Sequence, residues 1–221
     1  MIQEDFNQTA IIHTEDGALI LLTQTLFKVI KAGLRLLNFL VSTFRVRILF
    51  RLNGIQYGKG LRAIGVPYVN VSLGGRAVVG NRLTIRVGTG VTEVGMSGSR
   101  ILVGPKGHLE IGSRVGISNV TLVCNNHVYI GDDVFIGGGV QIFDTNFHST
   151  DATIRTSGHE IREEVRTAPI RIGARAFIGA NAMIGKGVTI GDEAIVAAGS
   201  VVVSSIPPGA VWGGNPARKI R

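Results

Sequence analysis

The sequence predicts a mainly β fold: a parallel β-helix of hexapeptide repeats, preceded by an N-terminal helical segment. Three observations support this prediction. Aliphatic residues recur every six positions in the second half of the chain, many of the 31 glycines share that register, and polar residues near the start recur at helical spacing. Neither an α-helix, with a period of about 3.6, nor a strand, with a period of about 2, produces a strict period of six.

The repeat is clearest from Ile172 onward. Read in sixes, the segment is IGARAF, IGANAM, IGKGVT, IGDEAI, VAAGSV and VVSSIP, and its first position is always Ile or Val. An earlier block, IGDDVF and IGGGVQ, begins at Ile130, and looser copies lie upstream. This period fits a coil with three flat faces, one inward aliphatic residue on each and about 18 residues per turn. We expect glycine to permit tight turns at the corners.

Residues 19–52 are apolar apart from one narrow stripe of polar side chains. The stripe consists of Lys28, Lys31, Arg35, Asn38, Ser42 and Arg45. Steps of three and four positions place these side chains on one face of a helix. No uncharged run reaches about 18 residues, so we do not expect a membrane-crossing helix. The helical segment either covers the open end or a side of the β-helix, which we favour, or lies on a membrane surface.

These patterns divide the chain into three parts. Residues 1–53 form an N-terminal tail and amphipathic helical segment, and residues 54–206 form the β-helix, with an inserted loop at about 143–169. Residues 207–221 form a C-terminal tail. The polar N-terminus has no signal-peptide pattern, and a single cysteine fits a reducing compartment. We therefore expect a cytoplasmic protein, with peripheral contact on the inner face of the membrane left open.

Charge is distributed unevenly along the chain. The net charge is +8, and between Gly17 and Thr92 every charged residue is Lys or Arg, with no Asp or Glu. From Glu93 onward basic and acidic residues nearly balance. The first part of the chain therefore requires an anionic neighbour, for which we expect an anionic membrane surface or a polysaccharide and no nucleic acid.

The hexads, followed by IPPGAVWGGNPARKIR at the C-terminus, resemble the hexapeptide-repeat acyltransferases, in the branch of the maltose, galactoside and polysaccharide O-acetyltransferases. The resemblance covers roughly Gly54–Arg221 and is strongest over Ile130–Arg221. It implies a left-handed β-helix and a homotrimer with active sites between subunits. It also implies direct transfer from acetyl-CoA, with no metal and no acyl-enzyme, so Cys124 is interpreted as a buried small residue.

The segment DTNFHST (144–150) interrupts the ladder and carries the expected catalytic residues. Transfer to a hydroxyl requires a base for its proton, and histidine suits that role near neutral pH. His148 resembles the catalytic histidine of the family. Asp144 either orients His148 or, as an Asp in a turn, only caps its own backbone. Glu160, Glu163 and Glu164 are rival orienting groups in the same loop.

Other residues of the site follow from the resemblance and from the coil period. With about 18 residues per turn, Asp144 should lie beside Asn126, so that CNNH (124–127) forms the floor of the site. The residues expected to bind the acceptor are Asn119, Asn125 and His127. Small, aromatic and basic residues should contact coenzyme A, the small ones along its pantetheine arm and the basic ones at its phosphates. These residues are Phe177, Ala180, Lys186, Ala198, Gly199, Arg218 and Arg221.

The function expected from these residues is acetyl-CoA-dependent O-acetylation of a sugar hydroxyl, on a surface polysaccharide or its lipid-linked precursor. The alternative is N-acetylation of an amino sugar or nucleotide sugar. A γ-type carbonic anhydrase is a remote alternative, because its zinc site requires closely spaced histidines. An inactive structural solenoid is the last alternative.

Overall fold

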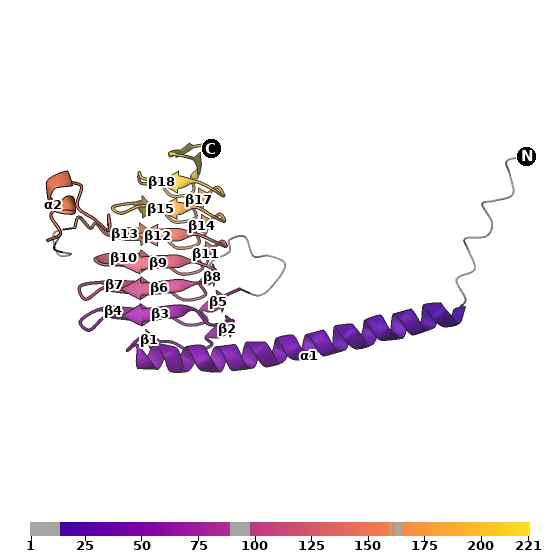
Figure 1. Ribbon diagram of the computed structural model, residues 1–221. Helices are drawn as coiled ribbons and strands as arrows, with labels where there is room; N and C mark the ends of the chain where they lie inside the picture. The colour runs from indigo at the N-terminus through magenta and orange to yellow at the C-terminus, as the bar shows by residue number, and fades with distance from the viewer. Residues whose placement is uncertain (1–13, 89–97, 160, 162–164) are drawn as a thin grey trace, which may run out of the picture.

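The computed structural model describes residues 14–88, 98–159, 161 and 165–221. The predicted parallel β-helix is confirmed: the chain visits three sheets in turn, so that three successive strands complete one coil and the coils stack along one axis (Figure 1). The core is the column of aliphatic side chains enclosed by the three sheets.

The three sheets, A, B and C, form the three faces of the β-helix. Sheet A contains β1 (Gln56–Tyr57), β4 (Arg76–Val79), β7 (His108–Ile111), β10 (His127–Ile130), β13 (Ile170–Ile172) and β16 (Thr189–Ile190). Sheet B contains β2 (Arg62–Ile64), β5 (Thr84–Arg86), β8 (Gly116–Ser118), β11 (Phe135–Ile136), β14 (Phe177–Ile178), β17 (Ile195–Val196), β19 (Val211–Gly214) and β20 (Ala217–Lys219). Sheet C contains β3 (Tyr68–Val71), β6 (Arg100–Val103), β9 (Thr121–Cys124), β12 (Gln141–Phe143), β15 (Met183–Ile184) and β18 (Val201–Val202).

In the coils after Ile170, each hexad position has its own environment. The first and fifth positions are buried, and the sixth points outward. The fourth position turns the corner with a left-handed backbone, which glycine and asparagine adopt most easily. The residues there are Arg175 (φ 57°), Asn181 (57°), Gly187 (76°), Glu193 (60°) and Gly199 (69°).

The glycine at the second hexad position has a different role from the one expected. A Cβ built on Gly179 would lie 2.5 Å from the backbone nitrogen of Ala198 in the next coil, and one on Gly131 would lie 2.7 Å from that of Ala174. Neither glycine has a positive φ. These glycines therefore permit adjacent coils to approach closely, whereas the turn itself is made at the fourth position.

The register between coils changes along the stack. Above the inserted loop, Phe177 pairs with Ile195, a step equal to three hexads. Below the loop the steps are longer, because Gln141 pairs with Thr121 and Arg62 pairs with Thr84. The expected alignment of Asp144 with Asn126 is therefore not a strict strand pairing, although the two residues are in contact through a hydrogen bond.

The predicted N-terminal helical segment is one helix, α1 (Thr14–Leu52), of 39 residues. It ends at a left-handed glycine, Gly54, with φ of 67°. The N–H of Ile55 donates to the carbonyl of Phe50, which satisfies a terminal carbonyl in the manner of a glycine C-cap. This geometry turns the chain directly from the helix into the first coil.

Only the C-terminal end of α1 packs on the β-helix. Ser42, Thr43, Val46 and Phe50 are buried there, and Thr43 Oγ1 accepts the N–H of Ala63. Ser42 of the polar stripe therefore faces the coils, whereas its stripe neighbours Asn38 and Arg45 are exposed. The rest of α1 extends beyond the stack (Figure 1).

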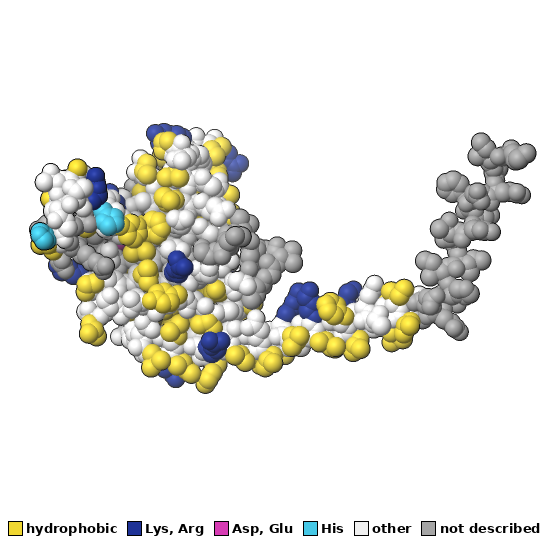
Figure 2. Space-filling model, viewed as in Figure 1, with side chains coloured by type: hydrophobic (Ala, Val, Ile, Leu, Met, Phe, Trp, Pro, Cys, Tyr) yellow, Lys and Arg dark blue, Asp and Glu magenta, His cyan; other side chains and the backbone are white. Residues whose placement is uncertain are grey.

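The opposite side of α1 is a continuous exposed apolar face. Leu37, Phe44 and Ile48 are 57%, 64% and 40% exposed, and they lie about half a turn from the buried side chains. Figure 2 shows hydrophobic side chains along the side of the helix that faces away from the coils. Among the described residues, no helix combines the length and the apolar character that a membrane span needs.

The end of the chain covers the other end of the stack. β19 continues sheet B beside β17, and β20 folds back on β19 as its antiparallel partner. Residues after 206, which the sequence assigns to a tail, thus lie against the last coil.

The inserted loop contains one short helix, α2 (Ala152–Thr156). It is capped by Asp151, whose side chain accepts the N–H of Thr153.

Candidate active site

The inserted loop leaves the corner between sheets C and A through a narrow neck. The N–H of Asn146 donates to the carbonyl of Arg166, and the N–H of Ala168 donates to the carbonyl of Asp144. Thr145 and Thr167 form an antiparallel bridge between the same two strands of the neck. The base of the loop is therefore held to the coil at both its ends.

Asp144 connects this neck to the coil below. Its two carboxylate oxygens accept the backbone N–H groups of Asn125 and Asn126, at 2.8 and 2.7 Å. The side chain is fully buried, and burial raises the pKa of the Asp144 carboxyl, although the two N–H groups oppose that shift. Asp144 therefore accepts backbone N–H groups of the neighbouring coil and ties the start of the loop to that coil.

His148 lies just beyond the neck and is exposed to solvent. The preceding residue, Phe147, has a left-handed φ of 65°, and its ring packs edge-on against Phe143 with centroids 5.1 Å apart. The Phe147 N–H also donates to Thr145 Oγ1. These contacts support the backbone immediately before His148. The three rival acids, Glu160, Glu163 and Glu164, lie outside the described residues.

Cys124 points into the core, as the sequence interpretation of this residue requires. It is fully buried, and burial together with the neighbouring Asp144 carboxylate raises the pKa of its thiol to about 12. A thiol with this pKa is protonated near neutral pH, and only the thiolate is a good nucleophile. The geometry therefore supports Cys124 as a packing residue.

His127 belongs to a cluster that the sequence did not reveal. Its ring stacks on His108 of the adjacent strand with centroids 5.0 Å apart, and its Nε2 lies 3.0 Å from Glu110 Oε1. Parallel register brings the three together, because His127 pairs with His108 and Glu110 follows two positions later on the same face. Their ligand atoms lie within 4.8 Å of one another, so these residues could hold a metal ion.

The two asparagines predicted to bind the acceptor occupy different corners. Asn125 is exposed at the corner between sheets C and A, beside the neck. Asn119 is buried at the corner between sheets B and C, with a left-handed φ of 45°, and its Oδ1 accepts the N–H of Gly88. Within one chain the structure brings Asn125 near the loop and does not bring Asn119 there.

The residues predicted to bind coenzyme A separate into three groups. Phe177, Ala180, Ala198 and Gly199 lie on sheet B or at its corner with sheet C, in adjacent coils. A Cβ built on Gly199 would meet no atom within 4 Å, so this corner is open. Arg218 and Arg221 lie at the top of sheet B, beside β19. Lys186 lies at the corner between sheets C and A, where the neighbouring Gly187 N–H donates to Ala168.

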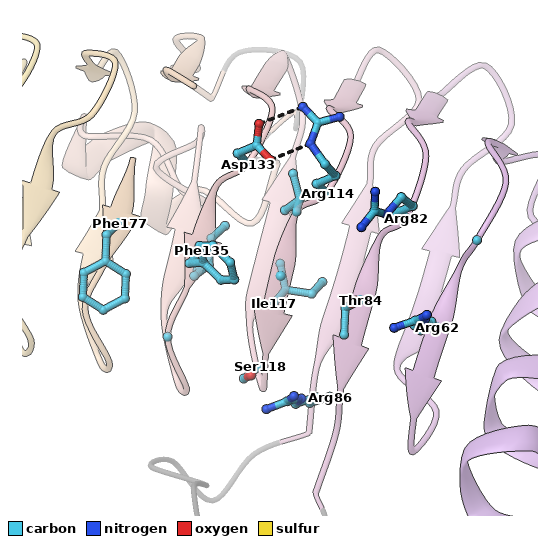
Figure 3. A pocket seen from close by; sticks show the side chains of 15 residues that line it. Arg62, Arg82, Thr84, Arg86, Arg114, Ile117, Ser118, Asp133, Phe135 and Phe177 are labelled. Atoms are coloured by element: carbon cyan, nitrogen blue, oxygen red, sulfur yellow. Dashed lines mark hydrogen bonds and ion pairs between the residues drawn. The ribbon is translucent and has the colours of Figure 1, made fainter. Parts of the chain in front are cut away.

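An open groove runs along the outward face of sheet B (Figure 3). Its volume is about 790 Å³. Phe135 and Phe177, which are register partners, lie toward one end, and arginines lie toward the end nearer α1. Gly116 lies between Phe135 and Thr84 in the strand ladder, and the Phe135 ring covers it, because a Cβ built on Gly116 would lie 3.2 Å from a ring carbon. Phe177 is the one groove residue that was predicted from the sequence as a site residue.

Some of the charged side chains around the groove form ion pairs and others do not. Arg114 forms ion pairs with Asp133, at 2.6 Å, and Asp132, at 3.2 Å. These hydrogen bonds raise the pKa of Arg114 and lower that of Asp133. In contrast, Arg62, Arg82 and Arg86 make no ion pair within residues 14–88, 98–159, 161 and 165–221. The α1 end of the groove is therefore positively charged.

Sequence comparisons connect the repeat to known proteins. The family described as "hexapeptide repeat of succinyl-transferase" matches residues 169–204. Galactoside O-acetyltransferase of Escherichia coli is 34% identical over 137 residues, which are 56% of this chain and 62% of that protein. The chain therefore matches less than two thirds of the length of this relative.

Structural comparisons agree on the fold. A hexapeptide-repeat acetyltransferase from Vibrio cholerae covers 81% of this chain and 80% of its own, at 24% identity and a TM-score of 0.50. A variant of the Bacillus cereus N-acyltransferase AntD, in complex with coenzyme A and dTDP-4-amino-4,6-dideoxyglucose, covers 79% and 87%, at 17% identity and a TM-score of 0.53. The chain thus carries the hexapeptide repeat and has the left-handed β-helix fold of the hexapeptide-repeat acetyltransferases, which confirms the resemblance predicted from its sequence.

Proposed function

We propose that this chain transfers the acetyl group of acetyl-CoA to a hydroxyl group of a sugar, on a surface polysaccharide or its precursor. The observation that carries the proposal is the position of His148, exposed and immediately beyond a hydrogen-bonded neck, in a coil whose sequence resembles a sugar O-acetyltransferase. A histidine in that position has both solvent access and a supported backbone.

The proposed chemistry is direct transfer. His148 takes the proton of the sugar hydroxyl as its oxygen attacks the thioester carbonyl carbon. Backbone N–H groups stabilise the negative charge that develops on the carbonyl oxygen. The carbon–sulfur bond then breaks, and the thiolate of coenzyme A leaves and is protonated. Cys124 takes no part, because its buried thiol is protonated near neutral pH.

Asp144 acts in this proposal as a positioning residue. Both of its oxygens accept backbone N–H groups from the Asn125–Asn126 corner, so it anchors the first residue of the loop to the coil. His148 lies four positions farther along the chain, just beyond the neck. Loss of the anchor would move His148 relative to the acceptor, and small displacements of a base reduce its effectiveness strongly.

Coenzyme A is proposed to lie along the corner between sheets B and C. Ala180, Ala198 and Gly199 leave the backbone accessible there, as a thin pantetheine arm requires. Arg218 and Arg221 lie beyond this corner and can meet the phosphates. Lys186 lies at another corner, so it could contribute to the same molecule of coenzyme A only from a second copy of the chain.

We propose a homotrimer for the same reason. His148 leaves the corner between sheets C and A, whereas Phe177, Ala198 and Asn119 belong to sheet B or to its corner with sheet C. These residues lie on different sides of one prism. A cyclic assembly brings the histidine corner of one copy against the cofactor corner of the next, and closed symmetry repeats that site in every copy.

The exposed face of α1 is proposed to lie on an anionic membrane surface. Its apolar side chains face away from the coils, and the chain from Gly17 to Thr92 contains basic residues and no acid. Each basic residue near anionic lipid contributes about 1 kcal/mol to binding. The full chain should therefore sediment with anionic vesicles and not with neutral ones. Recovery of the full chain in the supernatant at low salt would contradict this contact.

The activity is tested by thiol release from acetyl-CoA with a panel of free sugars, amino sugars and oligosaccharides. His148→Ala should lower turnover by about 10²–10⁴ and leave the folding transition unchanged. His159→Ala is the matched control, because His159 is an exposed histidine of the same loop. Unchanged turnover in His148→Ala would remove this residue from the mechanism, and preference for amino sugars would indicate N-acetylation.

A further inference from the structure

The sheet B groove has a chemical order along its length. Phe135 and Phe177 form its aromatic end, Gly116 and Ser118 its middle, and Arg62, Arg82 and Arg86 its cationic end (Figure 3). Strands in a sheet are spaced by about 4.8 Å, so the four steps from β2 to β14 span about 19 Å. The groove is therefore long enough for a sugar residue and the phosphate groups attached to it.

The three arginines lie on, or just before, two adjacent strands at the α1 end of sheet B. Arg62 pairs with Thr84, so Arg62 and Arg86 lie on adjacent strands of sheet B and both are exposed. Arg82 turns the corner just before β5 with a left-handed φ of 61°. None of the three makes an ion pair among the described residues, although the charge of Arg82 helps to lower the pKa of the Asp133 carboxyl. This cationic cluster fits a phosphate or diphosphate group.

A second, apolar hollow continues the groove beyond the arginines. It has a volume of about 240 Å³ and shares Gly60 and Arg62 with the groove. Its other walls include Phe39, Leu40 and Phe44 of α1. Leu40 and Phe44 are also 55% and 64% exposed. An apolar surface therefore begins directly beside the cationic cluster and runs onto the exposed face of the helix.

We propose that the groove binds a sugar acceptor carried on a lipid phosphate or diphosphate. The sugar lies against the outward faces of Phe135 and Phe177, the phosphates meet Arg62, Arg82 and Arg86, and the lipid chain leaves along Phe39, Leu40 and Phe44. The proposal rests on the proposed acetyl transfer to a sugar and names its class of acceptor. A nucleotide sugar has the same diphosphate but places a polar nucleoside against the apolar side chains of α1, so the lipid carrier fits better.

The test is binding of farnesyl diphosphate to the full chain by calorimetry, in the absence of acetyl-CoA. Inorganic pyrophosphate, farnesol and uridine diphosphate are the comparison probes. We expect farnesyl diphosphate to bind at least ~10-fold more tightly than each of the three, because only it fills both the cationic and the apolar part. Equal or tighter binding of uridine diphosphate would overturn the lipid assignment.

Substitutions separate the two parts of the groove. The double variant Arg62→Gln/Arg86→Gln should weaken farnesyl diphosphate and pyrophosphate at least ~10-fold. Leu40→Ser should weaken farnesyl diphosphate alone, since it changes only the apolar wall. Arg100→Gln is the matched control, because Arg100 is an exposed strand arginine on sheet C, and it should leave all binding unchanged. Equal weakening by Arg100→Gln would indicate nonspecific charge attraction and overturn the site.

Two further outcomes distinguish this proposal from the proposed activity. If the Arg62→Gln/Arg86→Gln variant loses affinity for coenzyme A and keeps it for farnesyl diphosphate, the arginines bind the cofactor and the lipid-phosphate site is wrong. If farnesyl diphosphate binds as expected while His148→Ala retains full turnover, the groove stands and the proposed role of His148 fails. The arginines have no ion pair to lose among the described residues, so thermal unfolding of the double variant should match that of the unmodified chain.

Discussion

The coils above the inserted loop and the coils below it solve the same packing problem in different ways. Above the loop the step between paired residues is three hexads, and Arg175 and Glu193 on one edge neutralise each other at 2.8 Å. Below the loop the steps are longer, Arg62, Arg82 and Arg86 are not paired with acids of the described chain, and the first coil is covered by α1. Strict repetition thus accompanies paired charges in the upper coils, where the cofactor is proposed to bind, whereas the longer steps of the lower coils accompany the unpaired arginines of the proposed acceptor groove.

The largest change in stability is expected from a substitution in α1, the helix that covers the first coil. Phe50 is fully buried and packs edge-on against Tyr57 with centroids 5.8 Å apart. Phe50→Ala should lower the free energy of unfolding by about 3–5 kcal/mol, because it leaves a cavity between α1 and the first coil. Phe44→Ala is the control on the same helix, since Phe44 is exposed. Similar losses in both variants, measured by denaturant unfolding, would mean that the lower end is not held by this contact.

The stability of the upper coils should depend most strongly on the close contact between adjacent coils at the second-position glycines. In Gly179→Ala the new Cβ would lie 2.5 Å from the backbone nitrogen of Ala198, which cannot move without separating two coils. We expect a loss of about 3 kcal/mol in the free energy of unfolding.

Gly116→Ala, in the groove below the loop, is the comparison for that change. Its Cβ would meet a Phe135 ring carbon at 3.2 Å, and a ring on the surface can rotate away. Its loss should be about 1 kcal/mol or less. Equal thermal unfolding midpoints for the two variants would show that the second hexad glycine is not required for stacking.

Asp144 lies at the junction between the two regions and should have an intermediate effect. Asp144→Asn turns an amide donor toward one of the two N–H groups at the Asn125–Asn126 corner, at a cost of about 2 kcal/mol. Burial raises the pKa of the Asp144 carboxyl in the folded state, so its protonated form is favoured by folding. Its contribution is therefore fully present below the unfolded pKa, about 3.9, and is lost as pH rises through the folded pKa.

Denaturant unfolding measured across that pH range tests the sign of the pH dependence expected for Asp144. The difference in stability between the unmodified chain and Asp144→Asn should become smaller as pH rises above about 4. A difference that grows with pH would mean that the folded state favours the ionised carboxylate, and would contradict the effect of burial.

The smallest change in stability is expected from single arginine substitutions, one above the inserted loop and one below it. Arg175→Gln removes the ion pair with Glu193 and should slightly lower the unfolding midpoint, less so in high salt. Arg82→Gln removes a cation that has no ion-pair partner among the described residues, so its midpoint should be unchanged or raised. A larger loss in Arg82→Gln than in Arg175→Gln would contradict the assignment of Arg82 to ligand binding.

The parts of the fold that sequence could predict are those that repeat. The first and fifth hexad positions are buried as the period implies, because every coil presents the same interior to its neighbours. The role of the second-position glycine was misjudged, since sequence shows that a small residue is wanted there but not whether conformation or space requires it. The Gly179 contact with the next coil makes that distinction.

The groove and the histidine cluster could not be predicted because both depend on register. Arg86 lies two positions beyond Thr84, the register partner of Arg62, because the step between β2 and β5 is longer than three hexads. His108 and His127 stack because the step between β7 and β10 is also longer than the strict repeat. The orientation of α1 could not be predicted either, because the helical pattern identifies a polar stripe but does not show which side of the helix meets the coils.

The central claim is that the active site is assembled from two copies, His148 from one and the corner of Ala198 from the next. The direct measurement is acetyl transfer after mixing His148→Ala with Ala198→Tyr, each inactive alone, under mild dissociation followed by reassembly. In a cyclic trimer, random mixing leaves about a quarter of the sites with both native residues, so about a quarter of the unmodified activity should return. No recovery of activity from mixed trimers would contradict the claim and place both residues in a site within one chain.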